Sequence, residues 1–538
     1  MAASRRFLPL LLLALLLLAS AGLRCWNLRE VFIAGQTYFV DPDGYSRMTR
    51  VSEVVHHPGT VIRGHLFENW PQGTTPHTTA PFDYLVAALA GLLAPLSPSL
   101  RVAIDHAGAL VSPLLGLGTL LFLWLWAGRV HLPWRNTMLC AFAFNPILVH
   151  GTLLGRPDHQ SLQILLLAIA LASEARLLSW PPSRRWSALA GAAWGLACWV
   201  SIYEPLILLL ATLGLVALLA PRSLIARERR IGWGVLAGTL ALAFAIEGWR
   251  NPVPDPIVTH FFPFWARSIG EMNGAAPWSP LFQRWSWAWL PFTPLLLLWR
   301  RDRAGVFWCG LLALTYALTA WQVRWGYFFA LVFILSLPHQ LAPLTGLLRG
   351  WRWAVALFFF LGLWPLIAEW ESRFQPSELA RRQEDRADAV ALRQLADALR
   401  LQPPGGVLAP WWFSPALTYW TGFPCVAGSS HQSLPGIVET ARFYLTSDPE
   451  EALRILDERK VRYVVAYDAE RVLGTSAILL GLPKAPPPSP YLYAEWLYAR
   501  PHSPPPELES LGTNLAFRLF VYKPATREKP SRSSPVSE

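Results

Sequence analysis

Long apolar runs separated by short polar segments dominate the first 370 residues of the chain. A helix needs about 20 mostly apolar residues to cross a bilayer. On that measure the pattern predicts eleven membrane-spanning helices, near residues 7–23, 103–127, 137–154, 160–178, 187–203, 205–220, 231–247, 285–299, 305–322, 326–343 and 353–369. The fold class that follows is a polytopic α-helical membrane protein.

Arginine clusters between the apolar runs predict the orientation of the chain. Cytoplasmic loops of membrane proteins are enriched in Lys and Arg. If the N-terminal arginines are cytoplasmic, the later clusters fall on the same side after eleven spans: Arg129 and Arg135, Arg176 to Arg185, Arg222 to Arg230, Arg300 to Arg303, and Arg349 and Arg352. The N-terminus is therefore expected in the cytoplasm, and the odd number of spans places the C-terminal region outside.

Two apolar runs need separate treatment. Residues 1–23 have the form of a cleavable signal peptide, but the many spans that follow favour an uncleaved first helix. The run from Phe82 to Leu96 is short for a span, and a crossing there would invert every later arginine cluster. It is therefore predicted to lie in, or dip into, the outer membrane interface.

The same pattern predicts the domain organisation. Residues 1–370 form the transmembrane domain, with external segments at residues 24–101, 155–160 and 248–284. Residues 371–523 contain a charged helical stretch and then a helix-like E-E-A-L-R-I-L-D-E-R followed by a strand-like V-R-Y-V-V-A-Y, which predict a small α/β or α+β extracytoplasmic domain. Residues 524–538 are expected to be disordered.

Composition agrees with a membrane protein. The 538 residues are 53% hydrophobic and 15% charged, whereas a soluble domain has about 25% charged residues. The net charge of +11 could indicate a nucleic-acid partner, but the arginines lie in short clusters between apolar runs. They are better explained as topology signals, so membrane lipids and not nucleic acid are the expected surroundings.

Four acidic residues fall on the predicted outer side: Asp41, Asp43, Asp158 and Glu271. Acids near the ends of spans are costly unless they are paired, solvated or bound to a cation. Carboxylate oxygens suit Mg²⁺ or Mn²⁺, which can neutralise a pyrophosphate leaving group. The simpler interpretation is that Asp43 forms a turn and Asp158 caps a helix. Both interpretations stay open at this stage.

The order of several short motifs resembles the catalytic-subunit family of the oligosaccharyltransferases, membrane enzymes of the GT-C superfamily. The motifs are D-P-D-G-Y at residues 41–45, G-R-P-D-H-Q at 155–160, S-I-G-E at 268–271 and the pair W-W at 411–412. That family transfers glycans from polyprenyl-linked donors to asparagine side chains. The resemblance runs from the first span to about Tyr467.

Carried over by position, the resemblance implies roles for four residues. Asp43 would contact both the metal ion and the acceptor as a catalytic carboxylate, and Asp158 would lead the second metal motif. Glu271 would be the glutamate of a flexible external loop, where it would contact the acceptor, act as a catalytic residue and bind the metal ion. Arg324, in Q-V-R-W-G-Y-F, would lie near the donor and the acceptor as a further catalytic residue.

The tryptophan pair would bind the acceptor, but the sequence departs from the family after it. The family continues to an aspartate that helps bind the acceptor hydroxyl, whereas Phe413 and Ser414 follow Trp411 and Trp412 here. A charged hydrogen-bond acceptor is therefore missing from that position. The sequence therefore leaves open whether the acceptor is an asparagine in a sequon.

The second metal motif also departs from the family. Gln160 stands where the family has an acidic or His ligand, and it offers a weaker, neutral oxygen. His159 is adjacent but is expected to project elsewhere on a helix. Asp41 and His431, in A-G-S-S-H-Q, are further candidate site residues.

The resemblance implies an oligosaccharyltransferase-type enzyme that moves a glycan from a polyprenyl-(pyro)phosphate carrier to a protein acceptor, with Mg²⁺ or Mn²⁺, in a prokaryotic plasma membrane. One alternative is a GT-C transferase that moves a sugar from a polyprenyl phosphate to a lipid, glycan or hydroxyl acceptor. Another is a transporter of lipid-linked sugars. Transporters tend to place ionisable residues near the membrane midplane and to contain repeated halves, and neither feature is visible in this sequence.

Overall fold

The structure is a computed structural model that describes residues 2–76, 80–248, 255–299, 301–344, 362–487 and 489–523. It divides into two compact units. A helical unit contains Met1–Arg63, Pro76–Val253 and Ile269–Arg386, and a mixed unit contains Gly64–Thr75, Pro254–Ser268 and Ala387–Glu538. Two short segments that precede residue 371 therefore belong to the same unit as most of the C-terminal region. The predicted disordered tail, residues 524–538, lies outside the described residues.

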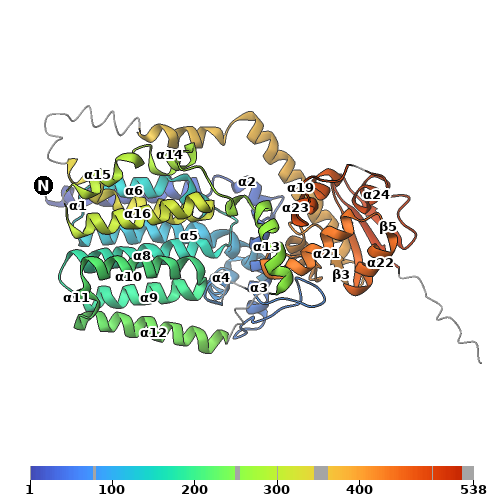
Figure 1. Ribbon diagram of the computed structural model, residues 1–538, viewed down its shortest axis with the longest axis horizontal. Coiled ribbons are helices and arrows are strands. Elements are labelled where there is room, and N and C mark those ends of the chain that lie inside the picture. The colour runs from blue at the N-terminus through green and yellow to red at the C-terminus, as the bar shows by residue number, and fades with distance from the viewer. Residues whose placement is uncertain are drawn as a thin grey trace, which may run out of the picture. The chain divides into compact units, whose positions relative to one another are not determined.

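The helical unit is built from long apolar helices that run along one common direction (Figure 1). They are α1 (Ala2–Arg24), α5 (Leu100–Arg129), α6 (Arg135–Phe144), α8 (His159–Ser179), α9 (Arg184–Val200), α10 (Tyr203–Leu219), α12 (Arg227–Glu247), α16 (Arg303–Trp321) and α17 (Gly326–Leu341). Among the described helices, α5, α8, α12 and α16 are long and apolar enough to cross a membrane. The full count of eleven spans stays a prediction, and residues 353–361 of the last of them, at 353–369, lie outside the described residues.

Shorter elements connect or extend these helices. They are α2 (Leu28–Val31), α7 (Pro146–His150), α11 (Pro221–Leu224), α14 (Pro280–Ser286), α15 (Thr293–Leu298) and the 3₁₀ turns Ala94–Leu96, Gly270–Met272, Leu290–Phe292 and Val323–Trp325. A two-stranded antiparallel hairpin pairs β1 (Phe32–Ile33) with β2 (Gln36–Thr37).

Two predicted spans are not single helices, and the first of these is residues 137–154. Asn145 adopts an extended backbone between α6 and α7 because it precedes Pro146, and proline disfavours the helical conformation of the residue before it. The side chain of Asn145 then caps α7 by accepting a hydrogen bond from Leu148 N at 3.3 Å.

The predicted span at 285–299 is also broken. Trp287 and Ala288 have φ angles of 58° and 60°, which end α14, and the chain continues through a 3₁₀ turn into the short helix α15. Left-handed backbone at non-glycine residues cannot continue a right-handed helix. The prediction of one continuous helix there was wrong.

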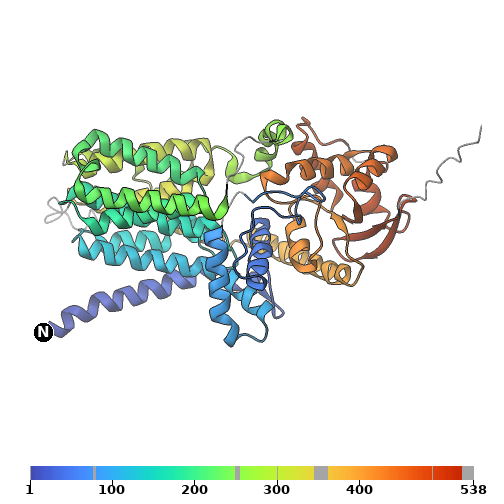
Figure 2. The ribbon, with the colours of Figure 1, turned by 90° about the horizontal axis from the view of Figure 1, so that it is seen from below.

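One end of the helical unit carries α3 (Pro42–His56) and α4 (Ala80–Leu93), which run across the direction of the long helices (Figure 2). The buried carboxylate of Asp83 on α4 joins them, because its two oxygens lie 2.9 Å from Arg47 Nη1 and 3.1 Å from Arg50 Nε on α3. At the start of α4, Ala80 N donates to Glu247 Oε1 at 2.8 Å. The predicted run at 82–96 is thus a helix laid across the bundle end.

Contacts at that same end link the first helix to the segment after the last predicted span. The ring of Trp26 lies 4.1 Å from Arg382 Cζ and 5.7 Å from Arg373 Cζ. Such cation–π contacts fix the start of α19 (Pro376–Arg400) beside the C-terminal end of α1. These two segments therefore lie together in the helical unit, while the number of spans and the orientation of the unit relative to the membrane stay predictions.

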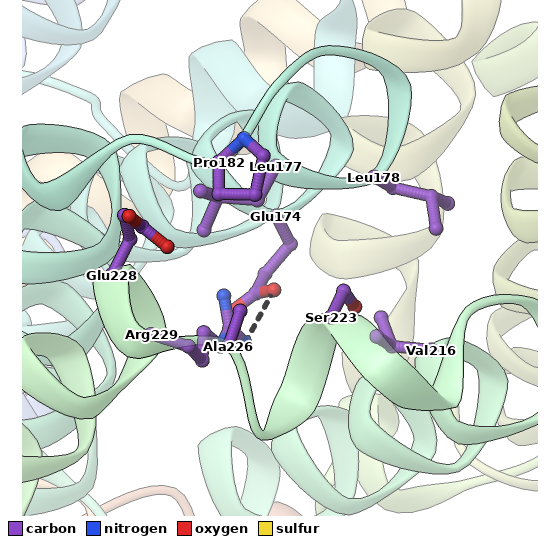
Figure 3. Close-up of a pocket in the computed structure, with 9 residues that line it drawn as sticks. All are labelled: Glu174, Leu177, Leu178, Pro182, Val216, Ser223, Ala226, Glu228 and Arg229. Carbon is purple, nitrogen blue, oxygen red and sulfur yellow. Dashed lines mark hydrogen bonds and ion pairs between the residues drawn. The ribbon is translucent and has the colours of Figure 1, made fainter.

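The long helices pack through small residues and one buried ion pair. A Cβ atom on Gly191 of α9 would lie 2.1 Å from the carbonyl oxygen of Gly232 on α12, so the two backbones touch. Arg229 Nη2 lies 2.7 Å from both carboxylate oxygens of Glu174 on α8 (Figure 3). This ion pair joins α8 to α12. The hollow beside it, of about 10 Å³, has room for about one water molecule and therefore leaves no space for a substrate.

The mixed unit is a four-stranded sheet with helices around it. The strand order is β3 (Gly406–Leu408), β4 (Val461–Ala466), β6 (Arg518–Tyr522) and β5 (Leu508–Thr513). β3 and β4 are parallel, and the other neighbours are antiparallel. The helices are α13 (Pro256–Ser268), the later part of α19, α20 (Ser414–Thr421), α21 (Leu434–Leu445), α22 (Pro449–Glu458), α23 (Ala469–Leu479) and α24 (Tyr493–Ala499).

The segment 64–75 is held in the mixed unit by specific contacts. Arg459 Nη1 donates to Asn69 Oδ1 at 3.0 Å and to Gln72 Oε1 at 2.6 Å. Trp70 Nε1 donates to the carbonyl oxygen of Lys460 at 3.3 Å. This part of the first predicted external loop is therefore tied to the C-terminal sheet.

Candidate active site

The D-P-D-G-Y and G-R-P-D-H-Q motifs meet at one end of the helical unit. Val40 N donates to the carbonyl oxygen of Gly155 at 2.9 Å. Asp41 caps α3 by accepting a hydrogen bond from Gly44 N at 2.8 Å, and a Cβ on Gly44 would lie 3.2 Å from Pro157 Cδ. Asp43 lies in the first turn of α3, directly after this cap. The two motifs, more than a hundred residues apart in the chain, are packed against one another.

Arg156 joins the carboxylates of the two motifs. Its Nε lies 2.9 Å from Asp41 Oδ2, and its Nη2 lies 3.5 Å from Asp158 Oδ2. Its Nη1 donates to the hydroxyl oxygen of Tyr327 at 2.9 Å and lies 2.8 Å from His150 Nδ1. The Arg156 side chain is only 8% exposed. Because a buried guanidinium with several partners holds a fixed orientation, it sets the spacing of the two acids.

His159 also contacts Asp158, with its Nδ1 2.6 Å from Asp158 Oδ1. The expectation that His159 projects elsewhere was wrong, because Asp158 is the N-cap of α8 with an extended backbone and is not inside the helix. Arg47 Nη2 lies 3.3 Å from the same His159 nitrogen. Burial raises the pKa of Asp158, but His159, Arg156 and Arg47 outweigh burial and hold that pKa below its usual range.

Asp41 shows the opposite balance. Burial raises its pKa above the usual range, although Arg156 opposes the rise. The negative charges of Asp158 and Glu271 act in the same direction as burial. Two acids that contact one arginine thus have pKa values pushed apart, a pattern that is common where proteins carry out chemistry.

Arg324 lies beside the S-I-G-E motif and is paired with a buried acid. Its Nη2 is 2.6 Å from Glu204 Oε1, and its Nη1 is 3.4 Å from Met272 Sδ, one residue after Glu271. Glu204 is 2% exposed. The structure thus pairs this buried acid at the start of α10 with Arg324.

The loop that carries Glu271 is fixed by backbone contacts. Ala275 N donates to the carbonyl oxygen of Ala320 at 3.0 Å, and Val323 N donates to that of Asn273 at 2.9 Å. A Cβ on Gly274 would lie 2.7 Å from the Ala320 carbonyl oxygen, so glycine permits this close approach. The loop is therefore attached to the end of α16 next to Arg324.

The candidate metal ligands can be compared with the arrangement of the described residues. No group of three or more His, Cys, Asp or Glu side chains within the described ranges is arranged to hold a metal ion, so Asp43, Asp158 and Glu271 do not form such a group. The side-chain oxygen of Gln160 is buried without a hydrogen-bond partner in this part of the chain. An unsatisfied buried oxygen near Asp158 fits a hard, oxygen-bound cation better than a zinc site.

The tryptophan pair lies in the mixed unit, after β3. The ring centroids of Trp411 and Trp412 are 6.0 Å apart at nearly right angles. Phe413, which stands where the family has an aspartate, packs edge-on against Tyr467 at 4.9 Å and Phe517 at 5.0 Å. The ring is part of an aromatic cluster, so this position has no polar group to offer a hydroxyl.

His431 belongs to a different contact. Its ring centroid lies 6.0 Å from that of Phe262 and 6.4 Å from that of Trp265, both on α13. The packing holds α13 against the start of α21 within the mixed unit.

The sequence analysis did not single out Arg156, Tyr327 and His150, which the structure places at the candidate active site. Of these three, only Arg156 lies inside a recognised motif, G-R-P-D-H-Q.

Comparison with known proteins identifies the fold. No protein-family model matches the sequence, and no curated protein matches it either. Solved structures do match, and the three described below are glycosyltransferases with the GT-C fold. The chain therefore shares that fold.

Three solved structures illustrate the likeness. The archaeal oligosaccharyltransferase AglB from Archaeoglobus fulgidus, in complex with an inhibitory peptide and a dolichol-phosphate, matches with a TM-score of 0.59 at 16% identity over 86% of this chain and 70% of that one. ArnT from Cupriavidus metallidurans bound to undecaprenyl phosphate matches with a TM-score of 0.53 at 13% identity over 97% and 98%. The arabinofuranosyltransferase AftD from Mycobacteria matches with a TM-score of 0.53 at 14% identity over 96% and 40%. At these identities the likeness establishes the fold.

Proposed function

We propose that the chain is a membrane glycosyltransferase that moves a glycan from a polyprenyl-(pyro)phosphate carrier to an acceptor at the end of the helical unit where α3, α8 and the loop at 269–275 meet. The observation that carries the proposal is the contact of the two acidic motifs through Arg156. Support comes from the GT-C fold and from the dolichol-phosphate and undecaprenyl phosphate held by the AglB and ArnT structures.

Each charged group has a role in this proposal. Arg324, next to the Glu271 loop, offers positive charge to the phosphate of the departing carrier. Asp43, at the start of α3, orients the nucleophile of the acceptor against the sugar carbon. Arg156 is a positioning residue, because it holds Asp41 and Asp158 and fixes the approach of α3 to α8.

A divalent cation is part of the proposal, and Mg²⁺ or Mn²⁺ is the expected identity. Asp43, Asp158 and the buried oxygen of Gln160 would hold it. Such an ion supplies charge neutralisation for a leaving phosphate or pyrophosphate. Further support comes from an AglB structure in complex with Zn and sulfate, although Zn differs from the metal proposed here.

The acceptor distinguishes two versions of the function. Trp411 and Trp412 resemble an acceptor-binding pair, which supports a protein acceptor as in the oligosaccharyltransferases. The packing of Phe413 against Tyr467 and Phe517 favours the second candidate, in which a sugar is transferred to a lipid, glycan or hydroxyl acceptor. The ArnT structure holds undecaprenyl phosphate, which supports the polyprenyl-phosphate donor of that candidate.

A two-by-two assay tests both versions. Purified protein is given a pyrophosphate-linked oligosaccharide or a monophosphate-linked sugar as donor, each with a sequon peptide or a lipid acceptor, and transfer is followed by mass spectrometry. Transfer to the peptide supports the oligosaccharyltransferase version, and transfer to the lipid supports the second candidate. In the same assay, Asp43→Asn tests the proposed site. Glu53→Gln is its matched control, since Glu53 is an exposed acid on the same helix. No transfer with any donor from correctly folded preparations would contradict the proposal.

A further inference from the structure

A hollow of about 560 Å³ opens at the end of the helical unit that is opposite to the acid cluster. Helix α8 connects the two places, because it begins at Asp158 and its last residues, Leu178 and Ser179, line the hollow. A helix of this length spans roughly 30 Å. The other walls come from the turn after α5, the start of α16 and the end of α17.

The lining is basic. Arg301, Arg303, His131 and His339 contribute to it, and Asp302 is the acid among them. The carboxylate of Asp302 is already engaged, because its Oδ1 accepts a hydrogen bond from Gly305 N at 2.7 Å and caps α16. Both arginines are exposed, and neither forms an ion pair with an acid in the part of the chain that the structure describes. Trp180 and Pro133 give the hollow apolar wall.

The backbone at this hollow is unusual for non-glycine residues. His131 and Arg301, both in the lining, have φ angles of 50° and 49°, and nearby Trp134 has 57°. Left-handed backbone at bulky residues carries an energetic cost and clusters at functional sites. Two turns that face one hollow therefore each hold a basic side chain at a strained position.

We propose that this hollow binds the phosphate group of an anionic phospholipid. Its volume lies in the range of pockets that bind small ligands. Guanidinium groups bind phosphate through paired hydrogen bonds, and basic pockets between membrane helices on the cytoplasmic side accept anionic headgroups. The predicted topology places this end of the helical unit in the cytoplasm. A soluble phosphate compound shares the same chemistry, and the experiment separates the two sources.

The test uses the full chain in nanodiscs of phosphatidylcholine with or without phosphatidylglycerol. Lipid that remains bound is counted by native mass spectrometry, and the melting temperature is recorded in both lipids. The variant is Arg301→Gln with Arg303→Gln. The control is Arg184→Gln with Arg185→Gln, which removes the same charge from exposed positions at the start of α9 that do not line the hollow. Inorganic phosphate is added to the phosphatidylcholine samples as the soluble probe.

The proposal expects phosphatidylglycerol to raise the melting temperature of the wild type and the control. The pocket variant should lose at least roughly ten-fold in retained phosphatidylglycerol, since each arginine near an anionic headgroup contributes about a five-fold factor. Protection by inorganic phosphate of the wild type and the control, but not of the pocket variant, would support the site with a soluble phosphate as its ligand. Equal loss in variant and control, or no loss in either, overturns the proposal. Equal melting temperatures of all three proteins in pure phosphatidylcholine verify that the variants fold.

Discussion

Replacing Arg156 with methionine removes a guanidinium that contacts both Asp41 and Asp158. Breaking a buried ion pair by removing one partner costs about 3–5 kcal/mol, because the remaining charge is left without compensation. Asp158 keeps His159, and Asp41 keeps its hydrogen bond from Gly44 N and is 25% exposed. The expected loss in the free energy of unfolding is therefore at the lower end, about 3 kcal/mol.

Unfolding by denaturant titration in mixed micelles measures this loss, and a second variant isolates its cause. Adding Asp41→Asn to Arg156→Met removes the uncompensated charge, so it should recover about half of the lost stability. Burial already raises the pKa of Asp41, and the loss of Arg156 raises it further. When the pKa of an acid is higher in the folded state than in the unfolded state, the free energy of unfolding rises as the pH falls. The stability lost in Arg156→Met should therefore shrink between pH 7 and pH 5. A cost of less than about 1 kcal/mol, as for a surface pair, would refute the reasoning.

Three further predictions concern packing, pH and acceptor recognition. Gly191→Ala should destabilise the protein by about 1–3 kcal/mol, because its Cβ would meet the Gly232 carbonyl oxygen, whereas Gly214→Ala in open space should not; thermal unfolding compares them. The lowered pKa of Asp158 provides stability that is fully present above about pH 4 and is lost below it. Unfolding free energies of wild type and Asp158→Asn should therefore converge as the pH falls below that value. Phe413→Asp should cost about 3 kcal/mol by denaturant titration and should not create transfer to a sequon peptide, because the position is part of aromatic packing.

The parts of the fold that follow from local pattern could be predicted from the sequence. Apolar runs at 103–127, 160–178 and 231–247 became α5, α8 and α12, because burial of apolar side chains in lipid or in the bundle requires helices of that length. The break at Trp287 and Ala288 could not be predicted, since the residues that adopt left-handed backbone there are apolar and carry no local turn signal.

The candidate site also has parts that the sequence could predict and parts that it could not. The two acidic motifs were recognised from their order along the chain, and their side chains lie near one another through Arg156. The pairing of Arg324 with Glu204 depends on helices 120 residues apart, so composition and spacing give no sign of it. The role of segment 64–75 in the mixed unit was hidden for the same reason: its partner Arg459 is 390 residues from Asn69.

The most direct test of the central claim is single-turnover transfer from a polyprenyl-linked glycan by purified wild type, Asp43→Asn, Asp158→Asn and the control Glu53→Gln. Activity is measured with the donor and acceptor that the two-by-two assay identifies. The proposed site predicts a loss of at least about a hundred-fold in both aspartate variants and near wild-type transfer by the control, with equal amounts of folded protein. Wild-type transfer by Asp43→Asn or Asp158→Asn would contradict the proposal that these two motifs form the active site.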